Sequence, residues 1–299
     1  MICADVGGSF VDVAYVTGSG AIERREKHPT PTDDWRAFVG VFSDYLAGSA
    51  GPGADRVSVA TAGLIDPDSG VLTSANIPSV DGRALRRDLS EALGRDVVLV
   101  NDADAFVLAE AEFGVARGHR RVFGIILGTG VGGGLLEDRT VVTGAGGVGG
   151  EWGHGQVVTK SPTNPGATPY FRCGCGRWGC LDTVGGARGM ERLHRFLHSR
   201  DTSSRDVVDG WRHGDAAASA TVDLYCDLVA GPLAMALNSF PATVVPVGGG
   251  LSSAHDLVAE LDRRVRGQML AGPPRPLLLP GALGSDAGLL GALLAGRSR

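Results

Sequence analysis

The residues best suited to chemistry in this chain are three cysteines within eight positions, Cys173, Cys175 and Cys180, and a histidine, His154, nineteen positions before the first of them. Thiolates and an imidazole are ligands that zinc prefers, and four of them complete its tetrahedral shell. The glycines that separate the cysteines permit the sharp turns that such a site needs. A disulfide pair and three incidental buried thiols are the alternatives, although a chain of cytosolic type seldom concentrates cysteine in this way. We expect a zinc ion with a filled shell, which holds a loop in place and activates no water.

Glycine-rich segments follow predicted strands at three places: DVGGS, GTGVGGG and VGGG. Bare backbone amides at such turns can point at phosphate oxygens without obstruction by side chains. Neither of the first two segments matches the P-loop or the dinucleotide fingerprint, and each alone could be a tight hairpin turn. Together they predict one nucleotide held from both sides. The residues proposed for this contact are Gly7, Gly8, Ser9, Gly128, Thr129, Gly130, Gly132, Gly248, Gly249 and Gly250.

Two carboxylates stand next to predicted strand ends. Asp5 comes immediately before the first glycine turn, where it could hold magnesium through water, because that ion uses few protein carboxylates beside substrate phosphates. Asn101 and Asp102 follow the apolar strand VVLV directly and precede a helix, so they lie at the carboxyl end of a strand, where α/β proteins bind ligands. The alternative is that Asp102 only caps the helix that begins at Ala103.

The hydrophobic pattern predicts an α/β chain in which one arrangement occurs twice. A strand, a glycine turn and a second strand open the chain and recur from Phe123, which indicates a duplicated architecture with a cleft between its halves. We expect a small lobe from residues 1–117 and the C-terminal helix 287–299, and a large lobe from 118–286 with the zinc segment 154–180. Strands are predicted at 2–4, 11–16, 22–28, 57–62, 97–100, 123–127, 135–137 and 243–246, and helices at 33–46, 86–93, 103–113, 190–197, 222–237 and 287–295.

Composition excludes several classes of function. With 299 residues, 43% hydrophobic and 20% charged, the chain is long enough for about two globular domains. A net charge of -5 gives no basic surface for nucleic acid. No secretion signal and no apolar run long enough to cross a bilayer are visible, so no membrane partner is expected. The five cysteines fit a reducing compartment, which we take to be the cytoplasm, with Cys226 as a core residue.

The motifs DVGGS, NDAD, LGTGVGGGL, GEWGH and CGCGRWGC occur in an order that resembles the ROK family of sugar kinases, and within it the bacterial N-acetylglucosamine kinases. The resemblance runs from residue 1 to about 292. It implies a two-lobed actin-like, hexokinase-like fold, the duplicated ribonuclease H-like ATPase architecture, with ATP and magnesium as phosphoryl donor. It also implies phosphorylation of the 6-hydroxyl of a hexose, N-acetyl-D-glucosamine before others, and a homodimer.

The resemblance assigns roles to individual positions. Asp102 matches the catalytic base, and Asn101 matches its sugar-binding neighbour. Glu151 and His154 match the pair that grips the sugar hydroxyls, and His154 would use its other ring nitrogen for zinc. A metal that fixes one imidazole nitrogen also fixes the tautomer and the aim of the ring. Asn76 matches a position that approaches the sugar from the small lobe.

Several positions depart from the family pattern. Ser9 and Phe10 stand in place of Thr-Lys, so that a hydroxyl is kept and a cation near the phosphates is lost. Asp104 replaces an asparagine. Asp182 replaces a glutamate that touches the sugar, and its shorter side chain is expected to shift or enlarge the sugar pocket. The loop ATAG at 60–63 lacks the family's proline.

Other readings of the resemblance remain open. The family includes sugar-responsive transcriptional regulators, but these carry a helix-turn-helix segment before the first glycine turn, for which the position of Asp5 leaves no room. A catalytically silent sugar-binding protein is suggested by Phe10 and Asp182. A kinase that prefers glucose, N-acetylmannosamine or another hexose is the third alternative.

Overall fold

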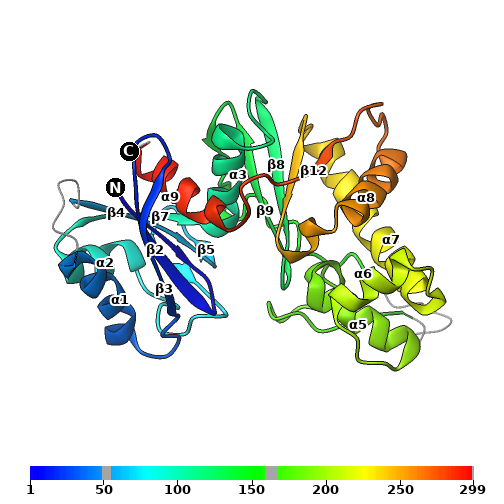
Figure 1. Ribbon diagram of the computed structural model, residues 1–299, viewed down its shortest axis with the longest axis horizontal. Coiled ribbons are helices and arrows are strands. Elements are labelled where there is room, and N and C mark those ends of the chain that lie inside the picture. Colours follow the sequence, from blue (N-terminus) through cyan, green and yellow to red (C-terminus); the bar gives the residue numbers. More distant parts are fainter. Residues whose placement is uncertain (49–54, 159–167, 298–299) are drawn as a thin grey trace. The chain divides into compact units, whose positions relative to one another are not determined.

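The structure of the chain, a computed structural model, describes residues 1–48, 55–158 and 168–297. It divides into two compact units (Figure 1). Unit 1 consists of Met1–Gly114, Gly134–Gly149 and Leu283–Arg299, and unit 2 of Val115–Gly133 and Gly150–Ala282. The lobe boundaries expected from the sequence stay a proposal. They differ from these units mainly in the segment 134–149, which the sequence pattern had assigned to the large lobe.

Unit 1 is built on a five-stranded sheet of order β3-β2-β1-β4-β7. The predicted order of a hairpin, a strand and then αβαβα is confirmed, and a small hairpin of β5 and β6 is added to it. The elements of this unit are β1 (Ile2–Val6), β2 (Phe10–Val16), β3 (Ile22–Pro29), α1 (Trp35–Ala47), β4 (Arg56–Thr61), β5 (Leu64–Ile65), β6 (Leu72–Thr73), α2 (Leu85–Leu93), β7 (Asp96–Asn101), α3 (Asp102–Phe113), β10 (Thr140–Val141) and α9 (Ala287–Arg297).

The strands of this sheet are held in a register that aligns their ends. β1 pairs antiparallel with β2 and parallel with β4, and β4 pairs parallel with β7. Val6 stands opposite Thr61, and Thr61 stands opposite Asn101. The carboxyl ends of β1, β4 and β7 therefore meet at one edge, where ligands of α/β proteins bind.

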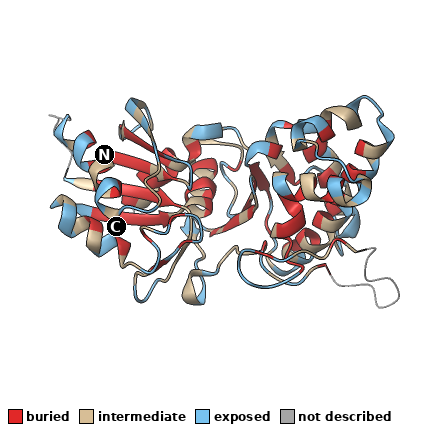
Figure 2. Cartoon of the chain, turned by 90° about the horizontal axis from the view of Figure 1, so that it is seen from below, coloured by how far each residue is buried: buried red, intermediate tan, exposed pale blue. Residues whose placement is uncertain are grey.

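Helices cover both faces of the sheet. On one face, the apolar side of β1 packs in a core with the aromatic residues Phe38, Phe42 and Tyr45 of α1 and with the buried leucines of α2. On the other face lies α9, which is tied to β4 by a buried hydrogen bond from Ser58 Oγ to the Ala292 carbonyl at 2.6 Å. Figure 2 shows the buried residues gathered in the strands and on the helix surfaces that face them. Burial of this apolar surface is the main source of stability for the edge that carries the site.

The second sheet has the order β10-β9-β8-β11-β12, which repeats the order of the first. The predicted duplication is thereby confirmed at the level of topology. β8 (Arg121–Leu127) lies parallel to β11 (Val245–Gly248), and β11 lies parallel to β12 (Leu278–Pro280). The remaining elements are β9 (Val131–Glu137), α4 (Asp182–Gly185), α5 (Ala187–His198), α6 (Ser204–Arg212), α7 (Ala216–Ser239) and α8 (His255–Gln268).

Several strand boundaries differ from the prediction by one or more residues, and those of β9 and β11 concern the glycine turns. β9 begins at Val131, so Gly132, Gly133 and Gly134 belong to a strand and not to a loop. The reason is close approach, since a Cβ at Gly133 would lie 2.7 Å from Trp152 and a Cβ at Gly134 would lie 2.7 Å from the Ala103 carbonyl oxygen. β11 begins and ends two residues later than predicted. The short elements β5, β6, β10, β12 and α4, and the helices α6 and α8, were not predicted.

One helix of the described chain, α7, is long and apolar enough to cross a bilayer by length and composition alone. The 24 residues of α7 include a window with a mean hydropathy of 1.3. Half of that window is buried inside the protein, where α7 packs against α5, α6 and α8. Cys226, predicted as a core residue, is fully buried on this helix. The apolar character of α7 is therefore that of a core helix.

Candidate active site and metal centre

The carboxyl edge of the first sheet carries the first glycine turn and Asp102. The amide of Gly7 donates to the Phe10 carbonyl at 2.9 Å, and the Thr30 hydroxyl donates to the Gly7 carbonyl at 2.6 Å, which closes the turn. Among the residues that the structure describes, the amides of Gly8 and Ser9 donate to no acceptor. Two adjacent backbone amides of this kind form a site for a phosphate oxygen.

The structure shows which of Asn101 and Asp102 caps helix α3, a point that the sequence left open. The helix cap is Asn101, whose Oδ1 accepts hydrogen bonds from the amides of Ala103 and Asp104 at 2.8 and 3.2 Å. Its Nδ2 donates to the carbonyl of Gly63 at 2.7 Å. Asp102 is the first residue of α3, and its carboxylate is half-buried and accepts from the Ala103 amide at 2.9 Å. Both ends of the Asn101 side-chain amide are thus hydrogen-bonded to the backbone, and Asp102 is not the N-cap of α3.

Asp5 lies on β1 directly opposite Asp12 of β2. Burial raises the pKa of Asp5 to about 7, and the carboxylates of Asp102 and Asp12 add to the effect, whereas Arg25 and Lys27 oppose it. The position of this carboxylate also explains a glycine, because a Cβ at position 288 of α9 would collide with it. A partly buried carboxylate beside other carboxylates is suited to a divalent cation, which offsets the cost of the desolvated charge.

Two side chains flank the first glycine turn. Asn76 is exposed and packs against it, since a Cβ at Gly8 would lie 3.1 Å from the Cβ of Asn76. Phe10 is also exposed, and the ammonium of Lys27 lies 4.5 Å from the centroid of its ring. Lys27 of β3, which the sequence alone did not indicate, thus places a positive charge beside Phe10.

The second and third glycine turns meet at the edge of the second sheet. Gly248 stands opposite Ile126, so the chain leaves β8 and β11 at the same level. Gly249 adopts a positive φ of 82°, and a Cβ there would lie 2.5 Å from the amide nitrogen of Gly128. Among the described residues, the amides of Thr129 and Gly130 have no acceptor. This turn thus repeats the arrangement found at the first one.

A cavity of about 390 Å³ opens beside the third turn. Its volume is within the range of small-molecule sites. Arg212 on its wall is fixed by ion pairs with Asp209 and Asp256 at 2.8 and 2.6 Å. The cavity is lined by Ala187, Ser204, Arg205, Val208, Asp209, Arg212, Gly250, Leu251, Ser253 and Ala254, of which only Gly250 was predicted from the sequence.

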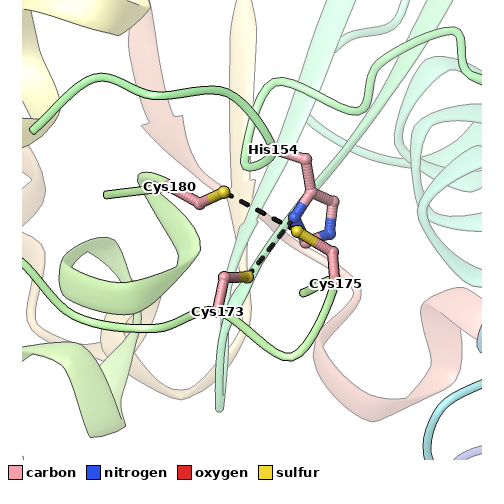
Figure 3. Close-up of side chains that lie close together, drawn as sticks. All are labelled: His154, Cys173, Cys175 and Cys180. Atoms are coloured by element: carbon pink, nitrogen blue, oxygen red, sulfur yellow. Dashed lines mark hydrogen bonds between the residues drawn. The ribbon is translucent and has the colours of Figure 1, made fainter. Parts of the chain in front are cut away.

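The cysteines and the histidine predicted as zinc ligands lie together in unit 2 (Figure 3). Their potential ligand atoms all lie within 4.8 Å of one another. Cys173 Sγ is 3.7 Å from Nδ1 of His154, and Cys175 Sγ is 3.7 Å from Cys180 Sγ. With zinc–sulfur bonds of about 2.3 Å, tetrahedral ligands stand about 3.8 Å apart. The four side chains therefore fit one zinc ion.

The spacing of the thiols also decides between the alternatives raised by the sequence. A disulfide needs a sulfur–sulfur distance of about 2.05 Å, and all five cysteines in the described chain are free. Burial raises the pKa of the Cys175 thiol, but hydrogen bonds with Arg177 and with the two neighbouring thiols together lower it to about 6. A thiolate at neutral pH is the form that binds a metal. Of the segment between His154 and Cys173, residues 159–167 lie outside the described residues.

His154 connects the cysteine cluster to Glu151. While Nδ1 faces the sulfurs, Nε2 lies 3.7 Å from Glu151 Oε2. Burial raises the pKa of Glu151, His154 lowers it, and the charge of Asp182 raises it further. Asp182 itself accepts a hydrogen bond from the amide of Val131 at 2.8 Å. The structure thus brings Glu151, His154 and Asp182 together within unit 2, as it brings Asp5, Asn76, Asn101 and Asp102 together with the first turn within unit 1.

Two sheets of equal strand order, each with a turn at its strand ends whose amides lack an acceptor among the described residues, define a duplicated α/β fold. The sequence pattern of the ROK family matches residues 1–297, and the chain therefore belongs to the ROK family.

Individual relatives match over nearly the whole chain. An N-acetylgalactosamine kinase of Shewanella sp. (strain ANA-3) is 31% identical over 98% of this chain and 95% of its own length. An N-acetyl-D-glucosamine kinase of Escherichia fergusonii is 32% identical over 96% of both chains. Among solved structures, a ROK hexokinase from Thermus thermophilus aligns with a TM-score of 0.80 at 30% identity, over 100% of this chain and 98% of its own. A ROK glucokinase from Streptomyces griseus in complex with glucose and AMPPNP aligns with a TM-score of 0.82 at 26% identity, over 100% and 99%.

Proposed function

We propose that this chain, an ATP-dependent sugar kinase of the ROK family, transfers the terminal phosphoryl group of ATP to the 6-hydroxyl of an N-acetylhexosamine, with N-acetyl-D-glucosamine as the preferred acceptor. The family match and the relatives that share 31–32% of its residues support the kinase. The preference for an acetamido sugar is supported by the names of those relatives, which are kinases of N-acetylglucosamine and N-acetylgalactosamine.

The observation that carries the proposal is the register of β1, β4 and β7. It places Asp102 at the same sheet edge as the two unbonded amides of Gly8 and Ser9. As the first residue of the twelve-residue helix α3, the Asp102 carboxylate lies at the positive end of the helix dipole. Phosphoryl transfer requires only modest basicity of a group in this position. In the loose transition state of this reaction, alignment and charge matter more than a strong base.

In the proposed reaction, Asp102 accepts a hydrogen bond from the 6-hydroxyl and takes its proton as the oxygen attacks the terminal phosphorus. The bond from phosphorus to the bridging oxygen of ADP breaks. The amides of the first and second glycine turns would hold phosphate oxygens, and the cavity beside Gly250 would take the nucleoside. Asp5 would hold the magnesium of ATP through water, and this ion would neutralise charge on the phosphates.

For the sugar, we propose Glu151 and His154 as the residues that bind hydroxyls directly, with Asn76 approaching from beside the first turn. Asn101 would act through the backbone, because both ends of its amide are committed to it. Zinc would bind Nδ1 of His154 together with Cys173, Cys175 and Cys180, and would leave Nε2 protonated as a donor. The ion would be structural, since four protein ligands fill its shell.

The test is a screen of acceptors at fixed ATP, with ADP release as the readout. The expected result is turnover with N-acetylglucosamine at a higher kcat/KM than with N-acetylgalactosamine, N-acetylmannosamine or glucose. Preference for another sugar would correct the acceptor and keep the kinase. ADP release with none of them, despite sugar binding, would favour the catalytically silent alternative. We further propose that the protein is cytoplasmic and forms a homodimer. Sedimentation of the purified protein would test the homodimer.

A further inference from the structure

Three segments of unit 2 meet at Val131, directly after the second glycine turn. The amide of Val131 donates to Oδ1 of Asp182 at 2.8 Å, and the amide of Asp182 donates to the Gly153 carbonyl at 2.9 Å. Gly153 closes the junction, because a Cβ there would lie 2.6 Å from the Val131 carbonyl oxygen. The glycine turn, the segment before His154 and the start of α4 are thus fixed to one another through one carboxylate.

The second oxygen of the same carboxylate faces the metal centre. Asp182 Oδ2 lies 3.6 Å from Sγ of Cys173, and Asp182 follows the ligand Cys180 by only two positions. Cys180 and the intervening Leu181 are fully buried, so the main chain at this point has little freedom. Asp182 therefore contacts the glycine turn with one oxygen and the cysteine cluster with the other.

The glycine turn is built around this carboxylate. A Cβ at Gly130 would collide with Asp182 Oδ1, so the carboxylate occupies the space that a side chain would need. On its other side, the turn is held by the first turn of α5, where the amide of Ala187 donates to the Gly128 carbonyl at 2.8 Å. Within this turn, the amides of Thr129 and Gly130 are left without an acceptor among the described residues.

We propose that Asp182 is a positioning residue that fixes the phosphate-binding turn Gly128–Gly130 to the metal centre, and that it does not bind the sugar. This assignment rests on the proposed function, because it takes the turn as a site for ATP phosphates. It departs from the role that the family resemblance gives to this position. Aspartate is one methylene shorter than the family's glutamate, and its carboxylate is committed to the Val131 amide. Direct selection of the acceptor would then fall to Glu151 and His154.

The test compares the KM for ATP with the KM for the sugar in variants of Asp182. Asp182→Ala removes the acceptor of the Val131 amide, so the KM for ATP is expected to rise about tenfold and ADP to bind about tenfold more weakly, with less than a twofold change in the KM for the sugar. Asp182→Asn keeps an oxygen that can accept from the amide, and both KM values are expected to stay within about threefold of wild type. Glu151→Gln is the matched comparison for a sugar ligand, in which the KM for the sugar should rise.

The opposite pattern of KM changes would overturn the proposed positioning role of Asp182. If Asp182→Asn or Asp182→Ala raises the KM for the sugar and leaves that for ATP unchanged, Asp182 binds the sugar. If the alanine variant does not fold, the asparagine variant decides alone, because an amide would disturb a carboxylate–hydroxyl contact while it keeps the contact to Val131. Zinc content, measured by elemental analysis, is expected to be retained in the asparagine variant. Should the wild-type protein phosphorylate no sugar, the proposed function fails by itself, and the ADP affinities of the same variants still test Asp182.

Discussion

Nε2 of His154 lies 3.7 Å from Glu151 Oε2, while Nδ1 of the same ring faces Cys173 Sγ at the same distance. One imidazole therefore belongs to two sites at once, the cysteine cluster and the pair proposed to bind the sugar. A zinc ion on Nδ1 would place the ring proton on Nε2 and hold the ring in a single orientation. Such an ion would have a physical role in a sugar kinase, which is to aim a hydrogen-bond donor.

Removal of one thiol from the cluster should affect both sites. In Cys175→Ser, we expect loss of zinc, a lower melting temperature and a KM for the sugar raised at least tenfold, because the ring of His154 is no longer fixed. Elemental analysis, thermal unfolding and steady-state kinetics measure the three effects. Cys226→Ala is the matched control, since this cysteine is buried in α7 and outside the cluster. It should lose stability but keep zinc and the KM for the sugar. Purified wild-type protein without zinc would contradict this prediction.

Asn101 is expected to contribute mainly to stability. Asn101→Ala removes the cap of α3 and the hydrogen bond to Gly63, and should lower the free energy of unfolding by about 1–3 kcal/mol. Asn101→Asp keeps the capping oxygen and loses only the donor to Gly63, so its loss should be smaller. Urea denaturation measures both variants. An alanine variant of wild-type stability whose KM for the sugar is raised would restore Asn101 to direct sugar binding.

Asp5 should make the metal-free protein less stable as the pH rises. Its folded pKa of about 7 lies above the unfolded value near 3.8, so the stability it contributes is full below about pH 4 and is lost as the pH rises to about 7. Between about pH 5 and pH 8, the free energy of unfolding of wild type is expected to fall by about 2–3 kcal/mol more than that of Asp5→Asn. The exposed Asp68→Asn serves as a control and should follow wild type. Denaturation curves at the two pH values are the measurement, and parallel losses in wild type and Asp5→Asn would refute the prediction.

Lys27 should supply the positive charge that Phe10 lacks. Lys27→Met keeps most of the aliphatic stem and removes the ammonium, so the KM for ATP is expected to rise about three- to tenfold with little change in the KM for the sugar. Phe10→Leu removes the ring on which the ammonium rests and should give a smaller change in the same direction. The exposed Arg36→Met, on α1, tests for a general effect of lost charge. Equal KM values for ATP in Lys27→Met and wild type would show that this lysine does not reach the phosphates.

Local patterns predicted the strands and helices that position the site. α1 repeats with a helical period because it buries one face, whereas β1 and β2 are buried almost throughout because helices cover both faces of their sheet. The cysteine cluster was predictable for a similar reason, since its spacing alone meets the needs of a tetrahedral ion.

The features that the sequence did not predict depend on contacts between residues far apart in the chain. Gly132–Gly134 resemble a loop in the sequence, and only the neighbouring Trp152 and Ala103 explain why a strand needs glycine there. Asn101 and Asp102 are equally good capping residues by type, so only geometry could separate their roles. The contacts of Lys27 with Phe10 and of Asp182 with Val131 join distant parts of the chain and leave no local signature.

Asp102 is proposed to take the proton of the acceptor hydroxyl. Asp102→Asn keeps the shape of the side chain and removes its basicity, so it tests this claim directly. ADP release with N-acetylglucosamine is expected to fall by at least about a thousandfold, while the affinity for the sugar, measured by calorimetry, stays within about threefold of wild type. Turnover by Asp102→Asn within about tenfold of the wild-type kcat would contradict the account and remove Asp102 from the reaction.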